Sequence, residues 1–101
     1  MFRVLAALAG ASGVAADVVI NEIHYAPDVK TEAVEFIELY NRGTNTVDLS
    51  GWQMTRAVQF TFSGGTVLAP GGLLVVAQDP VALKTKFGAT ALGPWSGRLG
   101  N

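Results

Sequence analysis

Glycine and proline divide this sequence into short runs of β-branched and aromatic residues, and this division limits its possible folds more than any other feature. The 101 residues include 12 glycines and 4 prolines, most of which fall between such runs. Turn residues recur at intervals of roughly eight to twelve residues. No stretch keeps a helical period of 3.6 residues. The spacing therefore predicts an all-β chain, a sandwich of about six to eight short strands.

The first predicted strand covers residues 18–25 and is closed by Pro27, which cannot donate to a strand ladder. Further strands are predicted at residues 34–41, 46–49, 52–56, 60–62, 66–68 and 73–77, with a brief pairing at 91–92. In residues 34–41 apolar side chains occur on both faces, which predicts a central strand. Alternation places the following side chains in the predicted core, with Trp52 at its centre: Ile20, Phe36, Ile37, Leu39, Trp52, Phe60, Phe62, Leu74 and Val76.

One short helix is predicted at residues 80–87. Asp79 offers a side-chain oxygen to the free N–H groups of a first turn, and Pro80 suits the first helical position. Gly88 supplies the stop signal after Phe87. A sandwich of short strands with a single helix near its end is the expected architecture.

Residues 1–16 have the pattern of a secretory signal peptide. Arg3 precedes an apolar run at residues 4–9, and Val14 and Ala16 occupy the −3 and −1 positions of a cleavage site. The apolar run is much shorter than the roughly 20 residues that span a bilayer, so no stable membrane anchor is expected. The alternative is a buried or amphipathic N-terminal helix. We expect a secreted or cell-envelope protein whose single domain covers residues 17–101.

Charge and cysteine content exclude several functions. Seven basic and eight acidic residues give a net charge of −1, so the summed field does not favour nucleic acid or anionic lipid. The absence of cysteine excludes disulfides, a thiolate metal site and a cysteine nucleophile. We expect no nucleic-acid partner and no cofactor.

Four segments in order, INEIHY, EFIELYN, VDLSGW and FTFSGGTVLAPGGLLVVA, resemble the lamin tail domain. The most specific part is residues 35–41 followed by residues 48–52. The resemblance implies an immunoglobulin-like sandwich without catalytic residues, which serves in bacterial exported proteins as a binding or tethering element. Its expected partner is a protein or a cell-envelope or extracellular component.

The chain ends at Gly100 and Asn101, which resemble the opening of a hairpin turn. The resemblance implies further strands after a short helix, so we expect residues 17–101 to lack the last strands of the domain. An alternative function is therefore an N-terminal accessory domain of a longer secreted hydrolase. A second alternative is a calcium-dependent binding module.

Several polar residues were weighed as candidate sites. His24 with Glu32 and Glu35 would form a mixed nitrogen and oxygen metal site, although one imidazole is few for zinc. Carboxylates near apolar strands would suit calcium or acid–base chemistry, but their spacing favours a structural role; they are Glu22, Glu35 and Glu38. No serine lies in a nucleophile elbow; those considered are Ser50, Ser63 and Ser96. We therefore expect no catalytic residues and no enzyme activity.

Trp95 and Arg98, in the turn-rich segment after the helix, form a candidate partner surface of one aromatic and one cationic group. The alternative is that Trp95 closes the open end of the sandwich and belongs to its core.

Overall fold

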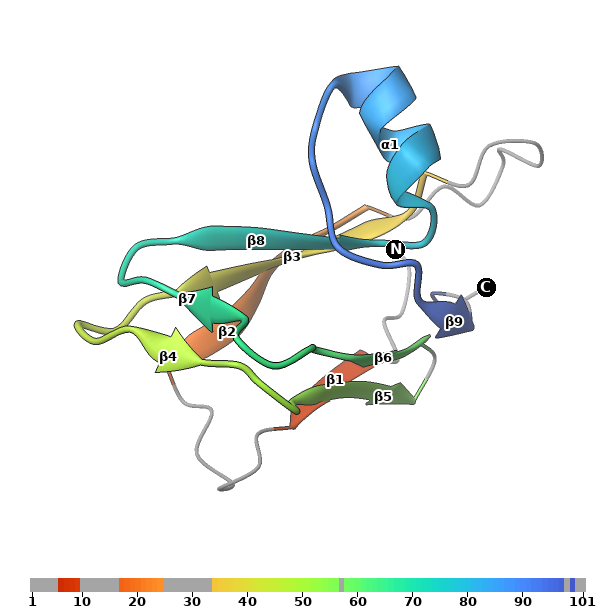
Figure 1. The fold of residues 1–101 in the computed structure, drawn as a ribbon. Coiled ribbons are helices and arrows are strands. Elements are labelled where there is room, and N and C mark those ends of the chain that lie inside the picture. The colour runs from red at the N-terminus through yellow and green to blue at the C-terminus, as the bar shows by residue number, and fades with distance from the viewer. Residues whose placement is uncertain (1–5, 10–16, 25–33, 57, 98, 100–101) are drawn as a thin grey trace.

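The computed structural model describes residues 6–9, 17–24, 34–56, 58–97 and 99 (Figure 1). In chain order its elements are β1 (Ala6–Ala9), β2 (Val18–His24), β3 (Phe36–Asn41), β4 (Val47–Asp48), β5 (Gln53–Arg56), β6 (Val58–Thr61), β7 (Val67–Leu68), β8 (Leu73–Ala77), α1 (Pro80–Phe87) and β9 (Ser96–Gly97). The predicted fold class, mostly β with one short helix, is confirmed.

Two antiparallel sheets form the body of the domain. One has the order β2-β3-β8, so β3 is central, as its two apolar faces predicted. The other has the order β1-β5-β6-β9, and β4 and β7 form a separate two-stranded ladder. Figure 1 shows the first sheet lying above β5 and β6, with α1 on the opposite side of that sheet. The arrangement is a β-sandwich with a helix on one outer face.

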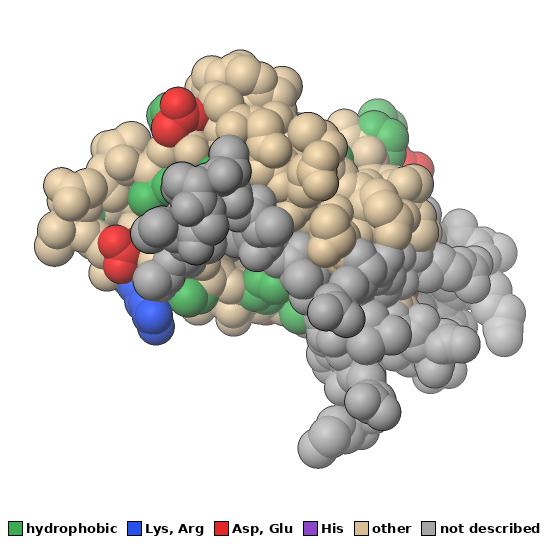
Figure 2. All heavy atoms as spheres, turned by 90° about the horizontal axis from the view of Figure 1, so that it is seen from below, with side chains coloured by type: hydrophobic (Ala, Val, Ile, Leu, Met, Phe, Trp, Pro, Cys, Tyr) green, Lys and Arg blue, Asp and Glu red, His purple; other side chains and the backbone are tan. Residues whose placement is uncertain are grey.

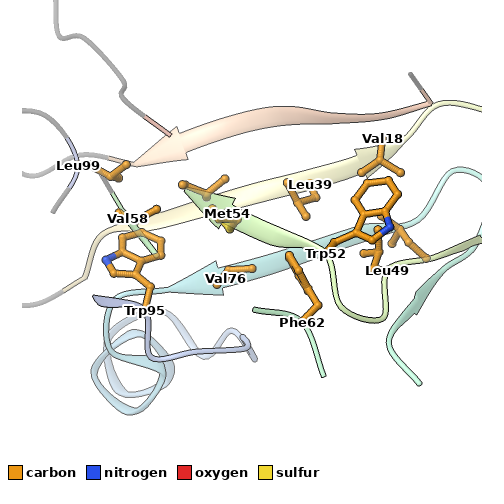
Figure 3. Close-up of a cluster of buried hydrophobic side chains, with 12 residues drawn as sticks. Val18, Leu39, Leu49, Trp52, Met54, Val58, Phe62, Val76, Trp95 and Leu99 are labelled. Carbon is orange, nitrogen blue, oxygen red and sulfur yellow. The ribbon is translucent and has the colours of Figure 1, made fainter. Parts of the chain in front are cut away.

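The core fills the space between the two sheets. Ile37 and Leu39 of β3 point inward and have no exposed surface, while the residues that alternate with them are half-buried. Met54 of β5 meets them from the other sheet. Figure 3 shows Trp52 beside Val18 at one end of this core. Each fully buried aliphatic or aromatic side chain of this kind stabilises the fold by about 1.5–3 kcal/mol.

The side chains predicted as core divide into three groups. The buried group consists of Ile37, Leu39, Trp52, Phe62 and Val76. The partly buried group that packs on the same core consists of Ile20, Phe60 and Leu74. Phe36 is different, because alternation along β3 places it on the outer face, where it packs against a second small cluster. Phe36 therefore packs with this second cluster and does not lie between the two sheets.

Helix α1 has the boundaries that its caps predicted. The Asp79 Oδ1 atom accepts hydrogen bonds from the Val81 and Ala82 amides, both at 3.1 Å. At the other end Gly88 adopts a φ of 74°, and its amide donates to the Lys84 carbonyl at 2.8 Å. The buried side chain of the helix is Leu83, which joins the second cluster beneath it. The helix therefore covers one end of the outer face of β2-β3-β8.

Asn41, the last residue of β3, is buried with no exposed surface. Its Nδ2 donates to the carbonyls of Asn45 and Leu68, both at 2.8 Å, and its Oδ1 accepts from the Gly43 amide at 2.9 Å. In the sequence, Asn41 stands before Arg42 and Gly43, where asparagine and glycine are typical of a turn because they tolerate positive φ. Its role instead lies in its side chain, which satisfies buried backbone groups of two loops.

The segment after α1 runs along the free side of β8. The Leu92 amide donates to the Val75 carbonyl and the Ala77 amide donates to the Leu92 carbonyl, both at 2.9 Å. This confirms the pairing predicted at residues 91–92. Gly93 has a φ of 130°, and a Cβ atom there would overlap the Ala77 carbonyl oxygen. Glycine thus permits the close approach of this segment to β8.

Residues 6–9, the middle of the expected signal peptide, form β1 and pair antiparallel with β5. The other residues of that peptide lie outside the described part, so its cleavage stays a prediction. Among the described residues no helix has the length and apolar character to cross a bilayer.

Candidate functional site

A groove with a volume of about 360 Å³ lies on the outer face of the β2-β3-β8 sheet, next to α1. Its lining comes from all three strands, from the helix and from one residue after the helix: Glu22, His24, Phe36, Glu38, Val75, Leu83, Phe87 and Ala89. The lining combines an apolar floor with two carboxylates and one imidazole. It is the candidate functional site.

Strand register brings these side chains onto one face. Glu22 pairs with Glu38 and His24 pairs with Phe36 across the β2-β3 ladder. The register shifts between Ile20 and Glu22, where β2 has a bulge. Without it, strict alternation from the inward Ile20 would turn Glu22 toward the core. The bulge therefore directs Glu22 and His24 into the groove.

Three rings form the aromatic part of the groove. The His24 and Phe36 rings stack with centroids 5.2 Å apart and planes 9° from parallel. The Phe87 ring meets His24 edge-on, at 6.0 Å and 79°. Phe87 is 51% exposed, so it presents aromatic surface to solvent at the end of α1. The groove can bury an apolar group of a partner against these rings.

The two carboxylates give the groove its electrostatic character. Glu22 and Glu38 are directly opposite each other in the antiparallel ladder, an arrangement in which like charges repel. The Glu38 Oε1 accepts a hydrogen bond from the Asn21 Nδ2 at 2.9 Å. A cation placed between the two carboxylates would relieve their repulsion.

The structure describes only part of the metal sites considered from the sequence. Glu32 lies outside the described residues. Glu35 does not line the groove with His24. Its Oε1 accepts a hydrogen bond from the Leu99 amide at 3.4 Å. Of the three carboxylates considered together, Glu22 and Glu38 line the groove and Glu35 does not. Within the described ranges, no group of three or more His, Cys, Asp or Glu side chains is suited to a metal ion.

The serines take part in local hydrogen bonds. The Ser50 Oγ accepts from the Gly65 amide at 2.8 Å, and the Ser50 amide donates to the Asp48 Oδ1 at 2.9 Å. The hydrogen bonds from the Ser50 side chain and backbone lower the pKa of Asp48. Ser96 Oγ donates to Gln59 Oε1 at 3.4 Å, and Ser63 Oγ lies 3.5 Å from Thr66 Oγ1. These contacts tie turns and strand ends together.

Trp95 does not form the partner surface that we considered. It is 6% exposed and packs at the opposite end of the core from Trp52, near Val58 and Leu99 (Figure 3). The Trp95 amide donates to the Ala77 carbonyl at 3.3 Å, which holds its backbone against β8. The expectation of an exposed patch was therefore wrong for Trp95, and Arg98 lies outside the described residues. The Trp95 Nε1 is buried without a hydrogen-bond partner among the described residues.

The groove residues were only partly recognised from the sequence. His24, Glu22 and Glu38 were weighed as ligands, whereas Phe36 was assigned to the core and Phe87 to the end of a helix. The sequence signal that could have identified Phe87 is an aromatic residue at the last position of the predicted helix, directly before Gly88. Nothing in the sequence pattern marks the bulge.

Comparison with known families agrees with this architecture. A family model described as Lamin Tail Domain matches residues 11–97, a range that begins after β1 and includes every later element. This family consists of non-catalytic, immunoglobulin-like interaction domains. Searches of curated proteins and of solved structures each found no match. Because the match covers most of the 101 residues, the chain belongs to the lamin tail domain family.

Proposed function

We propose that this domain is an exported, non-catalytic module that tethers a protein or cell-envelope component through the groove on the β2-β3-β8 sheet. The observation that carries the proposal is the groove itself, where exposed aromatic surface borders two opposed carboxylates. Export is supported by the signal-peptide pattern of residues 1–16.

The apolar part of the groove favours a partner with an apolar side chain. Phe87 is 51% exposed, and Phe36 and Val75 of the groove are partly buried, so all three have surface left to bury. Burial of apolar surface contributes roughly 25 cal/mol per Å². A contact that covers these residues therefore favours association without any chemical step.

The acidic pair favours a basic group in the same partner. Glu22 and Glu38 repel each other, and a lysine or arginine of the partner would be attracted to both. The preferred ligand is a segment in which a basic residue stands next to aliphatic or aromatic residues. A segment with an acidic residue in that place would be rejected.

A titration followed by nuclear magnetic resonance tests the binding step. The ¹⁵N-labelled full chain is titrated with two peptides of equal length, one alternating leucine and lysine and the other leucine and glutamate. We expect the basic peptide alone to shift amide signals of the groove residues. The Glu38→Gln variant should weaken binding by about two- to fivefold, the effect of one partly exposed charge pair.

Phe87→Ala tests the aromatic part of the groove, and Val67→Ala is its control. Val67 on β7 is 56% exposed and does not line the groove. We expect Phe87→Ala to weaken binding and Val67→Ala to leave it unchanged. Equal effects of the two variants, or equal binding of both peptides, would refute the groove as the tethering surface.

Export has a separate test. Expression of the full chain in a secreting bacterium, followed by N-terminal sequencing of the exported product, should give Asp17 as the first residue. An exported product that retains Met1 would contradict the proposed cleavage.

A further inference from the structure

The outer edge of β5 is occupied by a strand that precedes the family module. β5 has two neighbours in its sheet, β1 and β6. Residues 6–9 pair with residues 53–56, in the register Ala6 to Arg56 and Ala9 to Gln53. The family match starts at residue 11, so this neighbour of β5 is not part of the matched module. It lies instead within the expected leader.

The backbone of β5 has hydrogen-bonding groups directed at this neighbour. The Trp52 carbonyl accepts a hydrogen bond from the Phe62 amide at 2.9 Å, on the β6 side. Because backbone groups alternate in direction along a strand, those of Gln53 and Thr55 are directed to the β1 side. Removal of residues 1–16 would leave these groups without a strand partner. An open edge of this kind is a template for another strand.

We propose that the β5 edge, residues Gln53–Arg56, is a strand-acceptor site. Residues 6–9 fill it in the precursor, and in the exported protein it binds an extended, uncharged segment of a partner polypeptide with small and aliphatic side chains. This site is separate from the groove, and its opening rests on the proposed removal of the leader.

The side chains expected in the bound segment follow from the residues of β1 and β5 at this edge. The segment seated there has the sequence Ala-Ala-Leu-Ala and carries no charge. Met54 of β5 is 1% exposed and points into the core, so an incoming side chain paired with it borders apolar groups. In Figure 2, a view from the side on which β1 and β5 lie, hydrophobic side chains are visible on the part of the surface that is not grey. A charged side chain opposite Met54 would lose solvation without gaining a partner among these apolar groups.

Exchange of the leader strand for a peptide tests the proposal. A specific protease site is placed within residues 10–16 of the full chain, which is folded first and then cut. A fluorescent peptide with the sequence of residues 4–11 is added, and its binding is followed by anisotropy. We expect saturable binding to the cut chain and much weaker binding to the uncut chain, whose own β1 occupies the edge.

N-methylated peptides provide the matched control. Ala7 and Ala9 pair with Thr55 and Gln53, so their amides are directed toward β5, whereas the amide of Leu8 is directed away. Methylation at Ala7 and Ala9 should weaken binding by roughly 10- to 100-fold, the loss of two hydrogen bonds. Methylation at Leu8 should change it by less than about threefold.

Four outcomes would overturn the proposal. The first is no binding to a cut chain whose circular dichroism spectrum is unchanged, and the second is equal binding of the differently methylated peptides. The third is unfolding when the cut leader dissociates, because β1 would then be an integral strand. Dimerisation of the cut chain in place of peptide binding would also overturn it, since the occupant would be a second copy. Glu38→Gln should not affect the peptide, which separates this site from the groove.

Discussion

Replacement of the buried Asn41 by aspartate should test how much its side chain contributes to the fold. The two side chains have nearly the same shape, so packing is preserved. Aspartate keeps an acceptor for the Gly43 amide, but its second oxygen faces the carbonyls of Asn45 and Leu68, where asparagine donates two hydrogen bonds of 2.8 Å. The substitution therefore replaces two attractive contacts with two repulsive ones at a site that has no exposed surface.

The expected cost follows from these contacts. Each lost hydrogen bond costs about 0.5–1.5 kcal/mol, and an unpaired buried acceptor adds roughly 1–3 kcal/mol. We expect Asn41→Asp to lower the free energy of unfolding by about 3–5 kcal/mol at pH 7, against a total of about 5–15 kcal/mol for a typical domain. Urea unfolding of the full chain, followed by circular dichroism, measures this difference.

The pH dependence of the loss gives a second test. Burial should raise the pKa of the new carboxyl group above its unfolded value, because it disfavours the charged form; the protonated form can also donate to one of the two carbonyls. The loss should therefore be smallest below the unfolded pKa and should grow as the pH rises through the folded pKa.

Asn45→Asp is the matched control, since Asn45 is exposed and gains the same charge. We expect this variant to lie within about 0.5 kcal/mol of the wild type. Equal effects of the two substitutions, or a loss at position 41 that does not change with pH, would refute the reasoning.

Trp52→Ala should lower the free energy of unfolding by roughly 3–5 kcal/mol in denaturant titrations, because the side chain is 5% exposed within the core; a loss below about 1 kcal/mol would contradict its place there. Gly93→Ala should lower the melting temperature, since the new Cβ would overlap the Ala77 carbonyl oxygen, whereas the control Gly64→Ala, with open space around it, should not. The lowered pKa of Asp48 stabilises the fold above its unfolded pKa, and this contribution is lost as the pH falls through the folded pKa. Asp48→Asn should therefore reduce the acid sensitivity of unfolding, and an unchanged pH profile would exclude that role. Millimolar Ca²⁺ should leave the melting temperature of the full chain unchanged, because the described residues include no group of three or more potential ligands; a clear increase would favour the calcium-dependent alternative.

Local signals in the sequence were sufficient for the helix and most strands. Asp79, Pro80 and Gly88 act through their own backbone geometry and caps, so the boundaries of α1 follow from a few neighbouring residues. The alternation of side chains along β3 likewise shows directly which residues lie on each of its two faces. The fold class needed no information about distant contacts.

Features that depend on distant contacts were not predictable in the same way. The place of Trp95 depends on how its segment pairs with β8, and the place of Phe36 depends on which face α1 covers. The groove needs the register of β2 against β3, which a single bulge changes. The sequence of residues 6–9 suggested part of a signal peptide, with an N-terminal helix as the alternative, so their pairing with β5 was not anticipated.

The bulge in β2 also bears on how such a domain can diversify. It lets one strand change phase halfway, so Ile20 and Ile23 both serve the core although they are three positions apart. Gain or loss of a single residue at Asn21 would exchange which later side chains of β2 face solvent, without altering the half of the strand before it. Related domains can therefore acquire different groove chemistry through one codon's insertion or deletion, while the first half of β2 keeps its packing.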